Sequence, residues 1–291
     1  MKKMGLTVTI IFEAESANYG ESIGNVAALK KISRGKGEQY TYISRQALRY
    51  NIVNQMGVDH TKIGLDGSVL QFAPDTTIKE SPEIDLFGYM KTAKPSKTRS
   101  AVVRLSNAIS LEPFRGDLDF LTNKGLLDRY NKQENELKDG GNIAQSEIHR
   151  SFYSYTITID LDKVGIDKND DIEIDNREKA ERVNRLLDTI RYLYRDIKGR
   201  REDLKPLFII GGVYTIKNPV FQNAIEVKNK TLIVDRIIDV LNEEIKESTK
   251  VGIVAGVFEN ENEIKEKLDV VTIKEFFEDL QRKVRDYYEG D

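Results

Sequence analysis

The chain has 291 residues, 39% hydrophobic and 32% charged, so it can bury a large core in one domain with insertions or in two domains. It has no cysteine and only two histidines, His60 and His149, which excludes disulfides, thiolate chemistry and histidine-rich metal sites. The net charge is −3, yet residues 1–104 carry 15 Lys/Arg against 10 Asp/Glu, so positive charge is concentrated near the amino end.

Residues 6–12 alternate apolar side chains with threonines, which predicts a half-buried strand. The apolar run is short and meets Glu13, so we expect a strand and no signal peptide. No apolar stretch approaches the roughly 20 residues that a membrane-spanning helix requires. We therefore expect a cytoplasmic protein with no membrane partner.

Residues 13–50 are polar and punctuated by glycines, and we expect them to form a basic loop that leads into a helix. Apolar side chains at helical spacing place this helix over residues 41–56, with Thr41 as the N-cap. Residues 57–100 show no sustained period and contain three prolines, which predicts an irregular insertion.

The basic loop and helix start form the first candidate binding site, because only Glu38 opposes their positive charge. Arg45 and Arg49 are four residues apart and share a helix face, near the partial positive charge of the helix start. Such phosphate contacts give affinity without sequence preference. A solvated basic loop is the alternative. The candidate residues are Lys30, Lys31, Arg34, Lys36, Ser44, Arg45 and Arg49.

A second candidate site lies at residues 91–104, which hold five Lys/Arg and no acid and follow the aromatic segment FGYM. Basic side chains beside an aromatic are typical of surfaces that bind single-stranded nucleic acid. Ordinary core packing of Phe87 and Met90 is the alternative. The candidate residues are Tyr89, Met90, Lys91, Lys94, Lys97 and Arg99.

Strands are expected at residues 101–105 and 152–161, and the long polar excursion 113–149 between them suggests a protruding hairpin. His149 and Arg150 at its end are further candidates for phosphate contacts. A structural histidine that caps the hairpin base is the alternative.

The carboxyl half predicts a helix over 177–197, a strand in PLFIIGGVYTI, a helix over 231–246, a strand-like run VGIVAGVF and a last helix that opens with a capping box of Thr272 and Glu275. The principal elements follow the order β-α-β-β-α-β of ferredoxin-like and RNA-recognition folds. We therefore predict an α+β protein with an RRM-like (ferredoxin-like) antiparallel sheet and long insertions.

Enzymatic motifs are missing: the sequence contains no GxxxxGK[ST], GxSxG or HExxH. Gly211 and Gly212 lie inside an apolar strand, where close packing explains them better than phosphate binding. We expect no enzymatic activity, no cofactor and no metal site. A carboxylate-based metal nuclease is the remaining alternative.

Two short segments, Glu21–Asn25 (ESIGN) and Ser44–Arg49 (SRQALR), resemble the N-terminal signature of the crRNA-binding backbone subunit of CRISPR Cascade complexes, in the type I-B, DevR-like branch. The resemblance adds Asn25 and Gln46 to the RNA-binding candidates and implies that Tyr89 or Met90 inserts between bases. It also implies a hand-like division: palm at 1–56, 100–112 and 150–291, fingers-like insertion at 57–99, and thumb-like hairpin at 113–149.

The resemblance implies that copies of the chain polymerise head to tail along a crRNA, contact its phosphates and leave its bases free to pair with target DNA. The other type I-B Cascade subunits are the implied partners. An autoregulatory RNA- or DNA-binding regulator is one alternative. A metal-dependent RNase of the type III backbone kind is another, for which the segment after the first strand offers Glu13, Glu15 and Glu21 but no aspartate.

Overall fold

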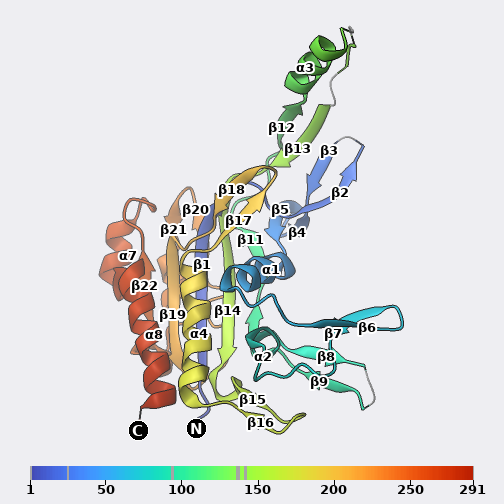
Figure 1. The fold of residues 1–291 in the computed structure, drawn as a ribbon. Helices are drawn as coiled ribbons and strands as arrows, with labels where there is room; N and C mark the ends of the chain where they lie inside the picture. Colours follow the sequence, from blue (N-terminus) through green and yellow to red (C-terminus); the bar gives the residue numbers. More distant parts are fainter. Residues whose placement is uncertain (1, 25, 93–94, 136–137, 141–142, 291) are drawn as a thin grey trace.

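The computed structural model describes residues 2–24, 26–92, 95–135, 138–140 and 143–290. Its centre is a nine-stranded sheet in the order β23-β22-β19-β1-β14-β11-β5-β4, with β10 pairing with β14 beside this path (Figure 1). All of these strand pairs are antiparallel except β22–β23, which confirms the predicted α+β class with a mainly antiparallel sheet. The strands are β1 Gly5–Ala14, β4 Lys31–Arg34, β5 Glu38–Ile43, β10 Val103–Leu105, β11 Ala108–Ser110, β14 Ser151–Asp160, β19 Phe208–Tyr214, β22 Lys250–Ile253 and β23 Val270–Thr272.

The central strand β1 is buried on both faces, so the prediction of a half-buried strand is wrong. Leu6, Val8, Ile10 and Phe12 pack into the main core, while Ile11 packs into a second apolar cluster on the opposite face. Thr9 on that second face is also buried and shares a hydrogen bond of 2.8 Å with Thr156. A second layer, formed by the carboxyl-terminal part of the chain, covers this face. The alternation of residues within the strand does not reveal this layer.

Helices α1, α4 and α8 cover the first face of the sheet (Figure 1). Residues from all three contribute to the main core, and α4 packs directly against α8. In the part of the chain that the structure describes, no helix is both long and apolar enough to cross a membrane. The helices are α1 Arg45–Met56, α2 Pro82–Phe87, α3 Lys124–Glu134, α4 Asn176–Arg191, α5 Val234–Ile238, α6 Glu243–Lys246, α7 Glu261–Lys267, α8 Ile273–Glu289 and the 3-10 turn η1 Leu161–Lys163.

Local capping decides where these helices begin. The Ser44 side chain accepts a hydrogen bond from the Ala47 N–H, so α1 starts later than predicted and Thr41 belongs to β5. The capping box of Thr272 and Glu275 at the start of α8 is confirmed. Helix α4 ends at Arg191, earlier than predicted, because the chain turns into a hairpin of two further strands.

The predicted single helix over 231–246 is wrong, because the segment divides into β21, α5 and α6, with Asn242 capping the last of these. Together with α7, these elements bury the second apolar cluster. Close packing around Gly211 is confirmed, since a Cβ atom there would collide with the carbonyl oxygen of Thr7.

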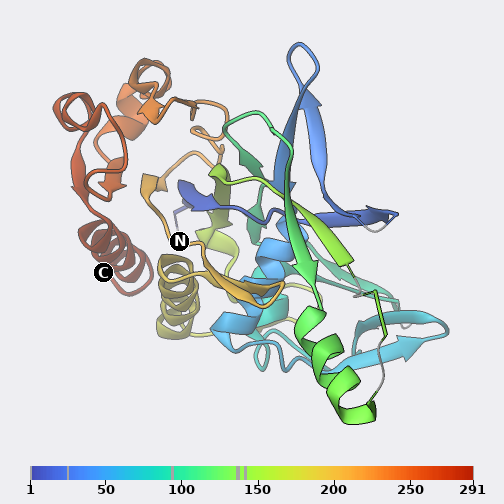
Figure 2. The same ribbon diagram turned by 90° about the horizontal axis from the view of Figure 1, so that it is seen from above.

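Several short hairpins project from this body (Figures 1 and 2). The expected basic loop is instead two hairpins, β2–β3 and β4–β5, and the expected irregular insertion contains β6–β7, α2 and β8–β9. The strands β12 and β13 pair antiparallel and carry α3 at their far end (Figure 1). The remaining strands are β2 Tyr19–Ile23, β3 Val26–Leu29, β6 Ile63–Asp66, β7 Val69–Phe72, β8 Tyr89–Lys91, β9 Lys97–Arg99, β12 Asp117–Thr122, β13 Ile143–Ile148, β15 Ile166–Asp167, β16 Ile172–Glu173, β17 Tyr194–Ile197, β18 Arg200–Asp203, β20 Val227–Lys228 and β21 Thr231–Leu232.

Candidate nucleic-acid interface

The β4–β5 hairpin and the start of α1 present three exposed cationic side chains, Arg34, Lys36 and Arg45. The hairpin turn is closed by a hydrogen bond of 3.2 Å from the Gly37 N–H to the Arg34 carbonyl. The Arg34 guanidinium lies 5.3 Å from the centre of the Tyr40 ring. Within the described residues none of these three cations forms an ion pair, so their charge is available to an external anion.

Arg34 and Arg45 lie at a groove of about 770 Å³, which we call the arginine groove. Its charged lining consists of three arginines and one glutamate, Glu226, which is ion-paired with Arg236 and Lys228. The remaining polar lining is neutral, so the groove combines a net positive charge with many hydrogen-bonding groups. The lining residues used below are Arg34, Arg45, Asn107, Ser154, Gln222, Asn223, Glu226 and Arg236.

Arg49 lies one helical turn beyond Arg45 but lines a different groove of about 490 Å³, together with the exposed side chain of Met90. We call this the Met90 groove. The Arg49 guanidinium lies 5.0 Å from the Phe87 ring centre and 3.7 Å from a Glu83 carboxylate oxygen. Burial lowers the pKa of Arg49 from its ordinary value. The α1 surface, where Gln46 is also exposed, therefore lies between the two grooves.

Other residues of the first predicted cluster occupy different positions. Lys31 is largely buried, forms an ion pair of 2.6 Å with Glu147 and lies 4.4 Å from the Phe114 ring centre. Lys30 is half-buried on the connection between β3 and β4. Ser44 caps α1, as described above. Asn25 lies outside the described residues.

The second predicted cluster is mostly committed to internal contacts, centred on the fully buried carboxylate of Asp85. This carboxylate accepts hydrogen bonds from Arg99 at 2.6 Å, from Arg182 at 2.9 Å and from the Gly165 N–H at 2.9 Å. Arg182 belongs to α4, and Arg99 to β9, so the bonds tie the projecting segment to the body. Arg99 is thus engaged as a structural brace, and its contact with RNA stays a prediction.

Three further members of this cluster also form contacts within the protein. Lys91 is buried and donates to the carbonyl oxygens of Pro74 and Thr76, and burial lowers its pKa. Lys97 forms an ion pair with Asp170. Tyr89 is 5% exposed and donates a hydrogen bond of 2.7 Å to Asp167, and burial raises its pKa to about 12.

Tyr89 is therefore not available for insertion between bases in this conformation, whereas the neighbouring Met90 is 61% exposed. The alternation of a strand explains the difference, since adjacent residues of β8 point to opposite faces. Lys94, the last residue of this predicted cluster, lies outside the described residues.

His149 and Arg150 lie where the β12–β13 hairpin joins β14, and only Arg150 is exposed. His149 Nδ1 is 2.8 Å from Thr41 Oγ1, and its ring packs edge-on against Phe114 at 5.5 Å between centroids. Burial lowers the pKa of His149 below its ordinary value of 6.5. The structural alternative thus describes His149 better, while Arg150 forms an ion pair with Glu13.

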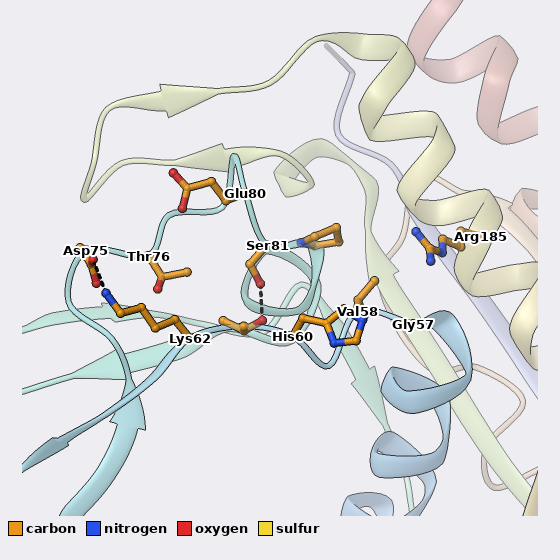
Figure 3. Close-up of a pocket in the computed structure, with 11 residues that line it drawn as sticks. Gly57, Val58, His60, Lys62, Asp75, Thr76, Glu80, Ser81 and Arg185 are labelled. Carbon is orange, nitrogen blue, oxygen red and sulfur yellow. Dashed lines mark hydrogen bonds and ion pairs between the residues drawn. The ribbon is translucent and has the colours of Figure 1, made fainter.

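A third hollow, of about 330 Å³, lies between the end of α1 and the segment before α2 (Figure 3). None of the predicted RNA-binding residues lines it. Its Lys62 side chain is bound to Asp75 at 2.7 Å, and Ser81 shares a hydrogen bond of 2.6 Å with Thr61 (Figure 3). Across the described residues no group of three or more acidic, histidine or cysteine side chains is placed to hold a metal ion.

Sequence reasoning missed the contribution of the segment between β19 and α6 to the arginine groove. Gln222, Asn223 and Arg236 line the same groove as Arg34 of the β4–β5 hairpin, although they lie far from that hairpin in sequence. The only local signal is the turn-forming sequence NPVFQN at residues 218–223. Their position depends on how the second layer packs on the sheet.

The α+β fold is similar to that of two solved chains from CRISPR surveillance complexes. One similar solved chain, from a "CRISPR RNA-guided surveillance complex, pre-nicking", has a TM-score of 0.59 and 12% sequence identity and covers 95% of this chain and 100% of its own. Another, from a "CRISPR RNA-guided surveillance complex", has a TM-score of 0.57 and 14% identity and covers 94% of this chain and 99% of its own. No curated protein sequence matches.

The family comparison is more specific. The family "CRISPR-associated negative auto-regulator DevR/Csa2" matches residues 6–234. The chain therefore belongs to the DevR/Csa2 family, and the resemblance drawn from its sequence is confirmed at this level.

Proposed function

We propose that the chain is the crRNA-binding backbone subunit of a type I-B CRISPR surveillance complex, that it works in the cytoplasm, and that it binds the guide without cutting it. The observation that carries this proposal is that two guanidiniums, Arg34 and Arg45, lie at a net positive groove of about 770 Å³ and form no ion pair among the described residues. Guanidinium groups bind phosphate through two parallel hydrogen bonds and stay charged at all physiological pH values.

The guide crosses the α1 surface from the arginine groove to the Met90 groove. Arg45 and Arg49 supply phosphate contacts along this path, and Gln46 lies exposed between them. Met90 supplies an apolar contact for a base. Contacts of this kind follow the backbone and tolerate any guide sequence, and pairing of the guide with target DNA supplies specificity.

The hand-like division is part of the proposal. The strand order β19-β1-β14-β10 in the middle of the sheet, with α1 and α4 on one face, supports a ferredoxin-like palm at residues 1–56, 100–112 and 150–291. Residues 57–99 then form the fingers-like insertion, and residues 113–149 form the thumb-like hairpin.

Head-to-tail association of copies is supported by the distribution of exposed apolar side chains over two separate projections. A protein that hides its core but exposes two such patches has partners for them. If one patch of each copy meets the other patch of the next copy, the contact does not close on itself and generates a filament. The patches are Ile63, Leu65, Val69 and Leu70 on one projection, and Leu118, Phe120, Leu121, Leu126, Tyr130 and Ile143 on the other.

The decisive experiment is to recover and sequence the nucleic acid that copurifies with the chain, co-expressed with its CRISPR array and the other type I-B Cascade subunits. We expect guide-length RNA with a repeat-derived 5′ handle, which stays intact when the purified protein is incubated with magnesium. Recovery of random RNA, or cleavage that depends on Glu21, would contradict the proposal.

A regulatory role is the second candidate, because the family description names a negative auto-regulator. Gel-shift assays with a promoter fragment of the chain's own operon and with a crRNA separate the two functions. Binding to the crRNA alone supports the guide-binding role, and specific binding to the promoter supports direct regulation.

A further inference from the structure

One wall of the arginine groove is formed by a turn that carries two exposed amides, Gln222 and Asn223. The Phe221 side chain, next in the chain, is fully buried and anchors this turn in the second apolar cluster. The Gln222 N–H donates to the Pro219 carbonyl at 2.9 Å, and Arg236 donates to the Asn223 carbonyl at 2.8 Å. The backbone of the turn is therefore held in place before any ligand arrives.

Unlike the backbone, the two amide side chains have no partner. Within the described residues neither the Gln222 nor the Asn223 side chain forms a hydrogen bond. Each amide offers one acceptor and two donor hydrogens. Glu226, the one carboxylate at the groove, is neutralised by Arg236 and Lys228, so it does not dominate the wall.

The chemistry of the two walls differs. Arg34 and Arg45 on one side recognise phosphate, which is identical in RNA and DNA. The neutral amides can donate hydrogen bonds to phosphate, but unlike arginine they also accept hydrogen bonds, so they match a hydroxyl group, which both donates and accepts. The ribose 2′-hydroxyl is the group by which a protein distinguishes RNA from DNA.

We infer that Gln222 and Asn223 form a ribose-reading wall, which binds 2′-hydroxyl groups of the strand whose phosphates Arg34 and Arg45 hold, and thereby makes the chain prefer RNA to DNA. This inference rests on the proposed function, because it assumes that the arginine groove holds the guide. It extends the binding site into the carboxyl-terminal half of the chain and gives the amides a role in selecting the type of nucleic acid.

Base recognition by the same amides is the competing explanation. It predicts that affinity changes with the sequence of the probe, whereas ribose recognition predicts that affinity changes only with the sugar. Probes of one length therefore distinguish the explanations when sugar and sequence are varied independently.

The test compares wild-type protein with the double variant Gln222→Ala/Asn223→Ala. Each protein is titrated with an RNA oligonucleotide and with its 2′-deoxy counterpart of the same sequence at fixed salt, and both titrations are repeated with a second sequence. Asn262→Ala, at an exposed amide on α7 away from the groove, is the matched control. Arg34→Ala serves as the contrasting variant.

We expect the wild type to prefer RNA, and the double variant to lose about threefold to tenfold in RNA affinity, the effect of one or two neutral hydrogen bonds. The affinity of the double variant for the deoxy probe should stay the same. Arg34→Ala should lower the affinity for both probes equally. The ribose-reading wall would be overturned if the double variant lost affinity equally for both sugars or lost no affinity. It would also be overturned if the loss in affinity depended on the base sequence. A wild type that binds neither probe would overturn the proposed function, and the inference with it.

Discussion

The β4–β5/α1 region and the residue 81–99 region are both rich in positive charge, yet the structure uses their charges in opposite ways. Arg34, Lys36 and Arg45 lie exposed without an ion pair among the described residues. Lys91 and Arg99 instead make internal contacts: a carbonyl oxygen accepts a hydrogen bond from Lys91, and a carboxylate neutralises Arg99. A basic run in a sequence therefore indicates a binding surface only where no internal acceptor reaches it.

The largest expected effect comes from breaking the buried brace. Asp85→Asn removes the charge that two nearly buried guanidiniums, Arg99 and Arg182, share. Removal of one partner from such a buried pair costs about 3–5 kcal/mol. Arg182 keeps its ion pair with Glu178, so the loss falls mainly on Arg99. Chemical denaturation measures this loss in the free energy of unfolding. Asp119→Asn, at an exposed position of β12, is the control, and equal stability of both variants would refute the role of the brace.

The free arginines should show the opposite behaviour. Arg34→Ala/Arg45→Ala should leave stability unchanged within about 0.5 kcal/mol, as for most surface substitutions. It should weaken RNA binding by about tenfold or more. Since each phosphate contact on a single strand contributes about −0.7 to the slope of log K against log salt, the slope should become shallower by about 1.4.

A salt titration of RNA affinity measures this slope. Arg201→Ala is the control, because Arg201 is exposed but ion-paired with Asp196. A double variant with the wild-type slope would show that neither guanidinium touches phosphate.

Protonation of His149, at the base of the β12–β13 hairpin, should make the stability of the protein depend on pH. Burial lowers its folded-state pKa below 6.5, so the unfolded state binds more protons between the two pKa values. Stability is then complete above pH 6.5 and decreases as the pH falls below it, by at most about 1.4 kcal/mol per pH unit. Denaturation of His149→Gln between pH 5 and pH 8 should show a shallower decrease than the wild type.

The control for this experiment is His60→Gln, because the His60 side chain is 84% exposed. A His149→Gln variant that keeps the full pH dependence of the wild type would assign that dependence to other groups.

The smallest expected effects come from variants of two adjacent residues of β8, Tyr89 and Met90. Tyr89→Phe removes the hydrogen bond to the buried Asp167 and should cost about 1 kcal/mol of stability without changing RNA affinity. Met90→Ala should leave stability unchanged and reduce RNA affinity by a few-fold, if Met90 contacts a base. Thermal unfolding and RNA titration of both variants measure the two effects. Reversed results would place Tyr89, and not Met90, at the interface.

Local patterns in the sequence predicted much of the fold. The strands β1 and β14, the helices α4 and α8 and the capping box at Thr272 were predicted from residues close together in the chain, and all are present in the structure. The errors occurred where distant residues decide the outcome. The second layer buries the other face of β1, and the polar segment after β1 pairs into hairpins.

For the candidate site too, the sequence predicted local features but not contacts between distant residues. The sequence singled out a basic cluster opposed only by Glu38, and within the described residues Arg34 and Arg45 of that cluster form no ion pair, whereas Lys31 pairs with Glu147. It could not identify Arg99 as a brace, because its partners Asp85 and the carbonyl of Ile166 come from other elements. It also could not place Gln222 and Asn223 beside Arg34.

The sequence by itself determined the α+β class, the absence of cysteine chemistry and the concentration of basic residues near the amino end. Tertiary structure alone decided which of those basic residues form internal ion pairs or hydrogen bonds and which stay exposed. Periodicity and composition act between neighbours in the chain, whereas desolvation and ion pairing act between neighbours in space. Arg182 meets Asp85 across 97 positions, and this contact helps to hold the second basic segment against the body.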